Sequence, residues 1–182
     1  MSIYTEPETV LLLLEKCTQF IIDYCCAIKR AGSVGVIIAE PAAGLLSNED
    51  CMNYSSVFIK KIVEKVQDET FAVILHNCGN MGQCTKAMVS VGAKGYHFGN
   101  KIDMLAALEE CPANALAMGN LDPVEVFKQA SAQEVYKQTY ELLERTSAYS
   151  NFVISTGCDV PPDIPMENIE AFYKAICQYN QN

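Results

Sequence analysis

One histidine and two cysteines in this sequence have the residue types that bind metal ions. His76 and Cys78 lie two residues apart in the segment LHNCGN, after the apolar run FAVI. Side chains two residues apart at a strand end point the same way. Imidazole and thiolate ligands suit Zn²⁺, and a catalytic zinc usually has three protein ligands and one open position. We therefore predict a zinc site, with Cys158 in the segment STGCD as the best-placed third ligand.

The same residues allow other interpretations. His-x-Cys is a short motif, and His76 and Cys78 also fit a hydrogen-bonded imidazole beside a buried thiol. Cys84 competes with Cys158 as the third ligand because it follows Cys78 in the next loop and helix segment. His97 fits a hydrogen-bonded residue at a strand end better than a ligand.

The other cysteines and the absence of a targeting pattern indicate a cytoplasmic protein. The N-terminal segment MSIYTEPE has no basic region, and no apolar run approaches the ~20 residues of a membrane span. A reducing compartment keeps thiols free, and the irregular cysteine spacing does not suggest disulfides. Five cysteines in helical segments are expected to be small core residues: Cys17, Cys25, Cys26, Cys51 and Cys177.

Composition limits the fold and the partners. The 182 residues, 50% of them hydrophobic, are enough for one domain, residues 1–182, with a substantial core. The chain has 13 Lys and Arg against 22 Asp and Glu, for a net charge of −9. This balance repels a phosphate backbone, so we expect no nucleic-acid partner. Because no apolar run is long enough to span a bilayer, we also expect no membrane partner.

Short apolar runs alternate with segments of helical spacing. A capping box at Thr5 and Glu8 predicts the start of a long first helix that ends at Gly32. Asp122 and Pro123 predict another helix start. The strands are expected at 34–41, 71–79, 93–100, 114–120 and 151–159, and the later helices at 48–67, 81–92, 103–111, 122–129, 131–148 and 165–179.

This alternation predicts an α/β fold of about five parallel βα units. In such folds the carboxyl ends of the strands meet at one edge of the sheet, where the site is built. The residues at that edge are Glu40, His76, Cys78, His97, Asn120, Asp122, Cys158 and Asp159. Glu40 is a candidate for orienting or protonating substrate, or for capping a helix. Asp159 is a candidate for a hydrogen bond to a metal ligand, or for turning the chain. Asn120 and Asp122 fit a role in the strand-to-helix turn better than one in substrate binding.

Three segments carry a resemblance to a known family: LHNCGN, AMGNLDPVEVF and FVISTGCDVPPDIPMENIEAFYKA. They resemble the C-terminal half of the uroporphyrinogen decarboxylase superfamily, and its zinc-dependent branch of methylcobamide:coenzyme M methyltransferases. The resemblance implies the C-terminal portion of a (β/α)8 TIM barrel without the N-terminal strands, in which His76, Cys78 and Cys158 hold one zinc ion. The segment GYHFGN departs from the acidic strand end usual at that position in the family.

The resemblance also implies the activity. A small thiol bound at the zinc would become a thiolate and accept a methyl group from a methyl-corrinoid (methylcobamide) on a partner protein, with Glu40 and Asp159 as weak catalytic candidates. One alternative is a metal-free decarboxylase of tetrapyrroles, disfavoured because Arg30 and Arg145 are the only arginines. Another is a non-catalytic remnant that binds a partner or metal.

A TIM barrel needs eight strands and about 250 residues, and five strands leave open edges. We therefore expect self-association or a further chain that completes the barrel.

Overall fold

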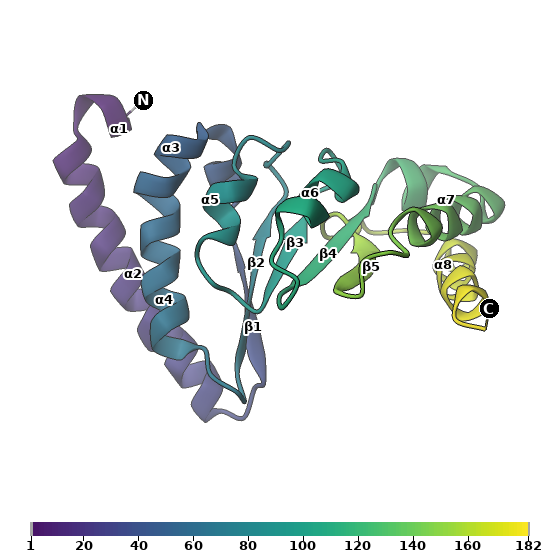
Figure 1. The fold of residues 1–182 in the computed structure, drawn as a ribbon, viewed down its shortest axis with the longest axis horizontal. Coiled ribbons are helices and arrows are strands. Elements are labelled where there is room, and N and C mark those ends of the chain that lie inside the picture. The colour runs from purple at the N-terminus through teal and green to yellow at the C-terminus, as the bar shows by residue number, and fades with distance from the viewer. Residues whose placement is uncertain (1, 182) are drawn as a thin grey trace.

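Residues 2–181, described by a computed structural model, contain one five-stranded parallel sheet in the order β1-β2-β3-β4-β5 (Figure 1). The strands are β1 (Gly35–Ala39), β2 (Ala72–Asn77), β3 (Gly95–Phe98), β4 (Leu116–Leu121) and β5 (Phe152–Thr156). Each strand follows the previous one in space as it does in sequence, with a helical connection between them. The predicted parallel α/β architecture is therefore confirmed, and all five carboxyl ends lie at one edge of the sheet.

The helical segments connect the strands. They are α1 (Ser2–Thr5), α2 (Pro7–Arg30), the 3-10 helix Pro41–Leu45, α3 (Asn48–Cys51), the π-helix Met52–Ser56, α4 (Val57–Val66), α5 (Thr85–Val89), α6 (Met104–Glu110), the π-helix Glu125–Gln129, α7 (Ala132–Arg145) and α8 (Met166–Tyr179). Helix α2 lies at the β1 end of the sheet, and α7 and α8 lie at the β5 end (Figure 1). Among residues 2–181, no helix has the length and apolar character needed to span a bilayer.

The helices cover one face of the sheet and form the core with it. Val73, Leu75, Tyr96, Phe98 and Ala117 on the strands are fully buried. They belong to the same apolar cluster as Ile62, Val66, Met88 and Ala107 of the helices. Alternation along each strand sends the intervening side chains to the opposite face.

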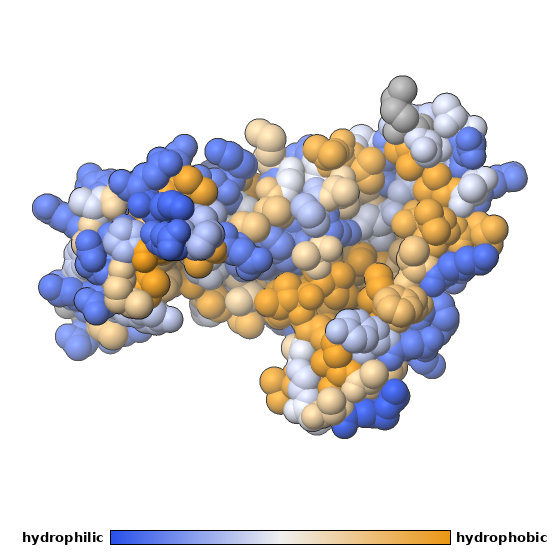
Figure 2. Space-filling view, turned by 180° about the vertical axis from the view of Figure 1, so that it is seen from behind, coloured by the Kyte–Doolittle hydropathy of each residue, from blue (hydrophilic) through white to orange (hydrophobic). Residues whose placement is uncertain are grey.

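The opposite face of the sheet is open. Ile37 is 68% exposed, Leu116 42% and Val153 36%. Figure 2 shows the apolar area that extends across the middle of the molecule on this side. The register of the strands places His76 beside His97, in one row with Ala39 and Met118. Ala39 lies two residues after Ile37 on β1, so this row lies on the same open face.

Local details differ from the sequence predictions. The capping box at Thr5 is wrong, because Glu6 occupies the N-cap position and makes no side-chain cap hydrogen bond. The helix predicted over 81–92 is confined to Thr85–Val89. The helices predicted over 48–67 and 122–129 contain or consist of π-helical turns.

The cysteine prediction holds only in part. Cys25 and Cys51 are buried, as expected of core residues, whereas Cys17 and Cys177 are exposed on α2 and α8. Helical spacing gave no information on which faces of these two helices are covered.

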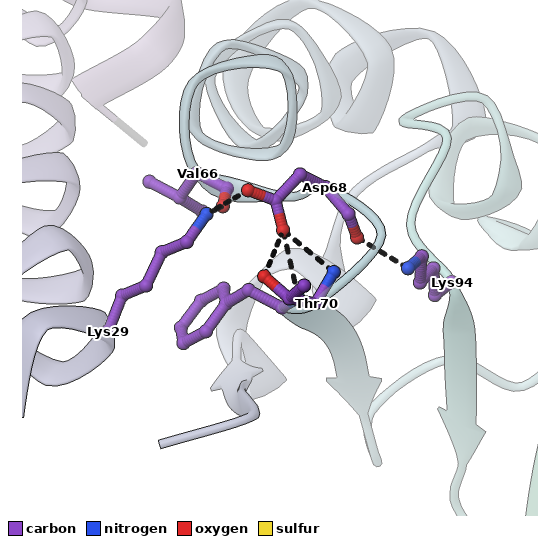
Figure 3. A network of polar contacts seen from close by, with 6 residues as sticks. Lys29, Val66, Asp68, Thr70 and Lys94 are labelled. Carbon is purple, nitrogen blue, oxygen red and sulfur yellow. Dashed lines mark hydrogen bonds and ion pairs between the residues drawn. The ribbon is translucent and has the colours of Figure 1, made fainter. Parts of the chain in front are cut away.

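Asp68 stabilises the turn that leads from α4 into β2 (Figure 3). Its Oδ1 accepts hydrogen bonds from the backbone N–H of Thr70 at 2.9 Å and of Phe71 at 3.0 Å. Its Oδ2 pairs with the Lys29 ammonium of α2, which also donates to the Val66 carbonyl at 3.1 Å. The ion pair with Lys29, followed by the hydrogen bonds from Thr70, holds the pKa of Asp68 well below its usual range. One side chain thus links α2, α4 and the start of β2.

Replacing Asp68 by alanine is expected to lower the free energy of unfolding at neutral pH, and Asp68→Asn is expected to lower it less. Asparagine keeps an acceptor for the Thr70 N–H but cannot form the ion pair. Because the pKa of Asp68 in the folded state lies below the ordinary aspartate value of 3.8, the ionic contribution to stability is present above that pH and is lost as the pH falls below it. Urea denaturation of the three proteins measures the effect; an alanine variant as stable as the wild type at neutral pH would contradict this role.

Candidate metal centre

The structure brings His76, Cys78 and Cys158 together. One potential ligand atom from each residue lies within 4.8 Å of the other two, although 80 residues of sequence separate Cys158 from Cys78 (158 − 78 = 80). The Cys158 Sγ lies 3.7 Å from the Nε2 of His76. Neither Cys84 nor His97 belongs to this group.

The separation of His76 and Cys158 is the one expected between two ligands of a tetrahedral zinc ion. At the usual Zn–N and Zn–S bond lengths, a tetrahedral ion holds a nitrogen and a sulfur ligand about 3.6 Å apart. The separation of 3.7 Å between His76 Nε2 and Cys158 Sγ agrees with that value. One imidazole and two thiols form a borderline-soft ligand set that favours Zn²⁺ over Mg²⁺ or Ca²⁺.

Two strand ends and two glycines position these ligands. His76 is in β2, Cys78 lies in the turn after it, and Cys158 follows β5. A Cβ atom at Gly99 would lie 2.7 Å from the Cα of Cys78, and one at Gly157 would lie 2.4 Å from the backbone nitrogen of Asn100. Both glycines therefore permit close backbone approaches that a larger residue would prevent. The loop after β3 lies between the loops that carry the two cysteines.

A chain of polar contacts continues from His76 away from the cysteines. The Nδ1 atoms of His76 and His97 are 2.6 Å apart, and the ring centroids are 4.7 Å apart. The Nε2 of His97 lies 2.9 Å from the Oγ of Ser155, which donates to the Thr156 carbonyl at 3.0 Å. Burial, followed by the neighbouring His76, lowers the pKa of His97. His97 is thus held as a neutral imidazole that can accept a hydrogen bond.

The electrostatics around Cys78 require a positive charge if both thiols are to ionise. Burial raises the pKa of the Cys78 thiol, and the neighbouring Cys158 raises it further. Two thiolates at this distance repel each other. A bound divalent cation would favour the thiolate forms of both cysteines, since a thiol that coordinates a metal ion is deprotonated.

The three ligands open into a pocket of about 600 Å³ at the open face of the sheet. Ile37, Ala39, Pro41 and Val160 provide an apolar wall, and Asp159 lies at the same pocket. No lysine or arginine lines it among the residues that the structure describes. The pocket has room for a small molecule beside the ligands and offers no cation to bind a carboxylate.

The sequence matches the model of a known protein family. The model described as "Uroporphyrinogen decarboxylase (URO-D)" matches residues 1–179. The chain belongs to the uroporphyrinogen decarboxylase family.

Relatives in this family have two different activities. The chain is 26% identical over 180 residues to the methylcobamide:CoM methyltransferase MtbA of Methanosarcina acetivorans, covering 98% of this chain and 52% of the relative. It is 28% identical over 177 residues to the uroporphyrinogen decarboxylase of Serratia proteamaculans, covering 95% of this chain and 49% of the relative. The chain therefore spans about half the length of these curated relatives.

A solved structure supports the fold. A methyltransferase from Methanosarcina mazei superposes with a TM-score of 0.79 at 24% identity, covering 90% of this chain and 47% of that one. The five strands correspond to part of a TIM barrel, as predicted.

Glu40, predicted at the site, lies in a different pocket from the three ligands. It lines an apolar pocket of about 400 Å³ that is also lined by residues of α2 and α4. The hydroxyl of Ser55 donates to its carboxylate. Burial raises the pKa of Glu40 to about 6, against the opposing hydrogen bond from Ser55. A catalytic role for Glu40 stays a prediction, and its position favours a structural one.

The competing ligand Cys84 and two residues predicted at the sheet edge, Asn120 and Asp122, form local hydrogen bonds. The Cys84 thiol is buried and donates to the Leu46 carbonyl at 3.1 Å. The Asn120 amide donates to the Ile102 carbonyl at 2.7 Å. Asp122 Oδ1 accepts the N–H groups of Val124 and Glu125, both at 2.8 Å. Asn120 and Asp122 therefore support the turns around them, as the sequence indicated.

The contact of His97 with His76 escaped the sequence analysis. Histidines 21 residues apart give no signal by themselves. Their neighbourhood follows only from the register of β2 with β3, which pairs the two residues directly.

Glu40→Gln is expected to stabilise the protein at neutral pH by up to about 2 kcal/mol, because it removes the cost of ionising a buried carboxyl whose pKa is raised from 4.5 to about 6. Since the folded state binds the proton more tightly than the unfolded state, wild-type stability should fall as the pH rises through that interval. Urea denaturation across this pH range should give a flatter profile for the variant. Parallel profiles for the two proteins would rule out this account of Glu40.

Proposed function

We propose that this chain forms the metal-binding part of a zinc-dependent, corrinoid-linked methyltransferase. The reaction would be transfer of a methyl group from a methylated corrinoid on a partner protein to the sulfur of a small thiol. The observation that supports it most directly is the convergence of His76, Cys78 and Cys158 beside a pocket of about 600 Å³.

The alternative in this family is decarboxylation of a tetrapyrrole, and sequence identity alone does not choose between them. The identities to the methyltransferase and to the decarboxylase are 26% and 28%. The pocket chemistry favours the methyltransferase. A substrate with many carboxylates needs cationic partners, and Arg145 is instead paired with Asp103 at 3.2 Å outside this pocket.

Each group in the pocket has a role in this proposal. Bound zinc would lower the pKa of the substrate thiol, so that it is present as a nucleophilic thiolate at neutral pH. His76, Cys78 and Cys158 would hold the metal and leave one position open. With Cys78 and Cys158 as thiolates, the charge of the ion would be balanced, and a further sulfur bound to it would stay electron-rich. Once a further segment covers the open face, the apolar wall from Ile37 and Val160 would help to exclude water from the pocket. Asp159 stays a candidate for orienting the thiol or a metal ligand.

Zinc binding is expected at close to one equivalent per chain, and Cys158→Ala should lose most of it. The matched control is Cys177→Ala, because Cys177 is an exposed cysteine on α8 outside the ligand group. Metal analysis after dialysis, with competition against a chelator, measures stoichiometry and affinity. Equal zinc content in wild type and Cys158→Ala would refute the proposed ligand set.

Activity provides the second test. With the barrel complete, transfer of the methyl group from methylcobalamin to a small uncharged thiol, 2-mercaptoethanol, should depend on Cys158 and not on Cys177. Zinc binding without methyl transfer would favour a non-catalytic metal-binding protein, and turnover of uroporphyrinogen without metal would favour the decarboxylase.

We further propose that a three-stranded βα segment completes the barrel, either from the same polypeptide or from another chain. A TIM barrel has eight strands, and residues 2–181 supply five, with β1 and β5 at the edges. A second copy would bring five more strands and would not close an eight-stranded barrel. Apolar side chains near the two free edges are exposed and would be covered by such a segment: Leu12, Leu13, Phe20 and Tyr24 of α2, Val34 and Ile37 at β1, and Val153, Val160 and Met166 near β5.

The isolated chain is expected to self-associate through these surfaces. Phe20 and Tyr24 are 69% and 61% exposed and stack on each other at 6.3 Å between ring centroids. The double change Phe20→Ser and Tyr24→Ser should shift the population towards monomer. Val124→Ser, which changes an exposed apolar residue in the loop after β4, is the control. Size-exclusion chromatography with light scattering gives the masses; a stable wild-type monomer would contradict the proposal.

A further inference from the structure

We propose that His97 is a positioning residue for His76. Together with Ser155, it fixes the His76 imidazole in the tautomer that leaves Nε2 free to bind a metal ion. This inference rests on the proposed metal site, but the contacts that support it lie on the opposite side of the His76 ring.

The contacts form one continuous line. His76 Nδ1 lies 2.6 Å from His97 Nδ1, and His97 Nε2 lies 2.9 Å from Ser155 Oγ. Ser155 Oγ lies 3.0 Å from the carbonyl oxygen of Thr156. His76 is only 9% exposed, so water competes little for its ring nitrogens.

The Thr156 carbonyl, at one end of this series of contacts, determines which atom carries the proton in each hydrogen bond. The Thr156 carbonyl has no hydrogen to donate, so the single hydrogen of the Ser155 hydroxyl points to it. Ser155 Oγ must then accept from His97, which places the proton of neutral His97 on Nε2. His97 Nδ1 is left with a lone pair and accepts from His76. His76 therefore carries its proton on Nδ1.

This tautomer is the one that a metal at Nε2 requires. A neutral imidazole binds through its unprotonated nitrogen, and the hydrogen bond at the other nitrogen determines which one that is. With Nδ1 protonated, the lone pair of His76 Nε2 is free on the side of Cys158, whose sulfur is 3.7 Å away. The polar line thus prepares the ligand before any ion arrives.

A backbone carbonyl offers a second, more distant acceptor for the His76 Nδ1 proton. The His97 carbonyl oxygen lies 3.2 Å from His76 Nδ1 and can accept the same hydrogen. Loss of the His97 imidazole should therefore weaken the preference for one tautomer without abolishing it. We expect a decrease of about tenfold in zinc affinity, at the lower end of the range for residues that support a metal ligand.

The chain has only two histidines, which makes the tautomers directly measurable. In the zinc-free protein, at a pH where both imidazoles are neutral, ¹⁵N–¹H correlation spectra should show His76 protonated at Nδ1 and His97 protonated at Nε2. His97→Phe, which keeps a ring but has no acceptor, should give a mixture of His76 tautomers. His97→Asn, whose side-chain oxygen can lie near the position of Nδ1, should restore the Nδ1–H form and most of the zinc affinity.

Ser155→Ala provides a second variant if His97→Phe does not fold. It removes the acceptor for His97 Nε2–H and should reduce the fraction of His76 protonated at Nδ1. The proposal is overturned if wild-type His76 is protonated at Nε2, or if the variant that folds leaves both the tautomer and the zinc affinity unchanged. Because the spectra are recorded without metal, failure of zinc binding in all proteins would refute the metal site while leaving the tautomer result to be judged separately.

Discussion

The parallel pairing of β2 with β3 is the interaction on which the candidate metal site depends. It places His76 directly beside His97 on the open face of the sheet. A shift of one residue would turn either imidazole into the helix-covered core, since successive side chains of a strand alternate between faces. The loop after β3 then lets both cysteine loops approach, because Gly99 and Gly157 have no side chain to hold them apart. Ligand geometry here is a product of strand register and backbone contact.

Stability and chemistry occupy opposite faces of the same sheet. The face under the helices contains the fully buried Val73, Leu75 and Tyr96, whereas the other face presents the two histidines among partly exposed apolar residues such as Ile37. The two histidines at the site are supported by polar contacts between side chains of different strands and not by the apolar core. A family with this architecture can change its pocket residues at little cost to the packing that holds the strands in place, which agrees with the different activities of the relatives.

The strands and the edge where the candidate residues meet were predictable from sequence, because buried parallel strands produce continuous apolar runs and bring their carboxyl ends together. The proximity of His76, Cys78 and Cys158 followed from that rule, while their binding of zinc stays a prediction. The contact of His97 with His76 needed the strand register, which periodicity does not give. From the sequence, Glu40 was placed with the site because it directly follows β1. Its side chain instead lines the pocket shared with α2 and α4, because successive side chains of a strand alternate between faces and the preceding Ala39 lies on the side of the site. The exposure of Cys17 and Cys177 depends on which faces of α2 and α8 pack against other elements, and the residues around each cysteine do not determine that.

The open face has a thermodynamic consequence. Any segment that packs over it would also displace water from around His76 and the two cysteines, which strengthens their interaction with a cation. Binding of the covering segment and binding of the cation would then favour each other. By thermodynamic linkage, each would raise the affinity of the other by the same factor. Availability of the metal in the cell would thereby help to decide how much of the protein is assembled.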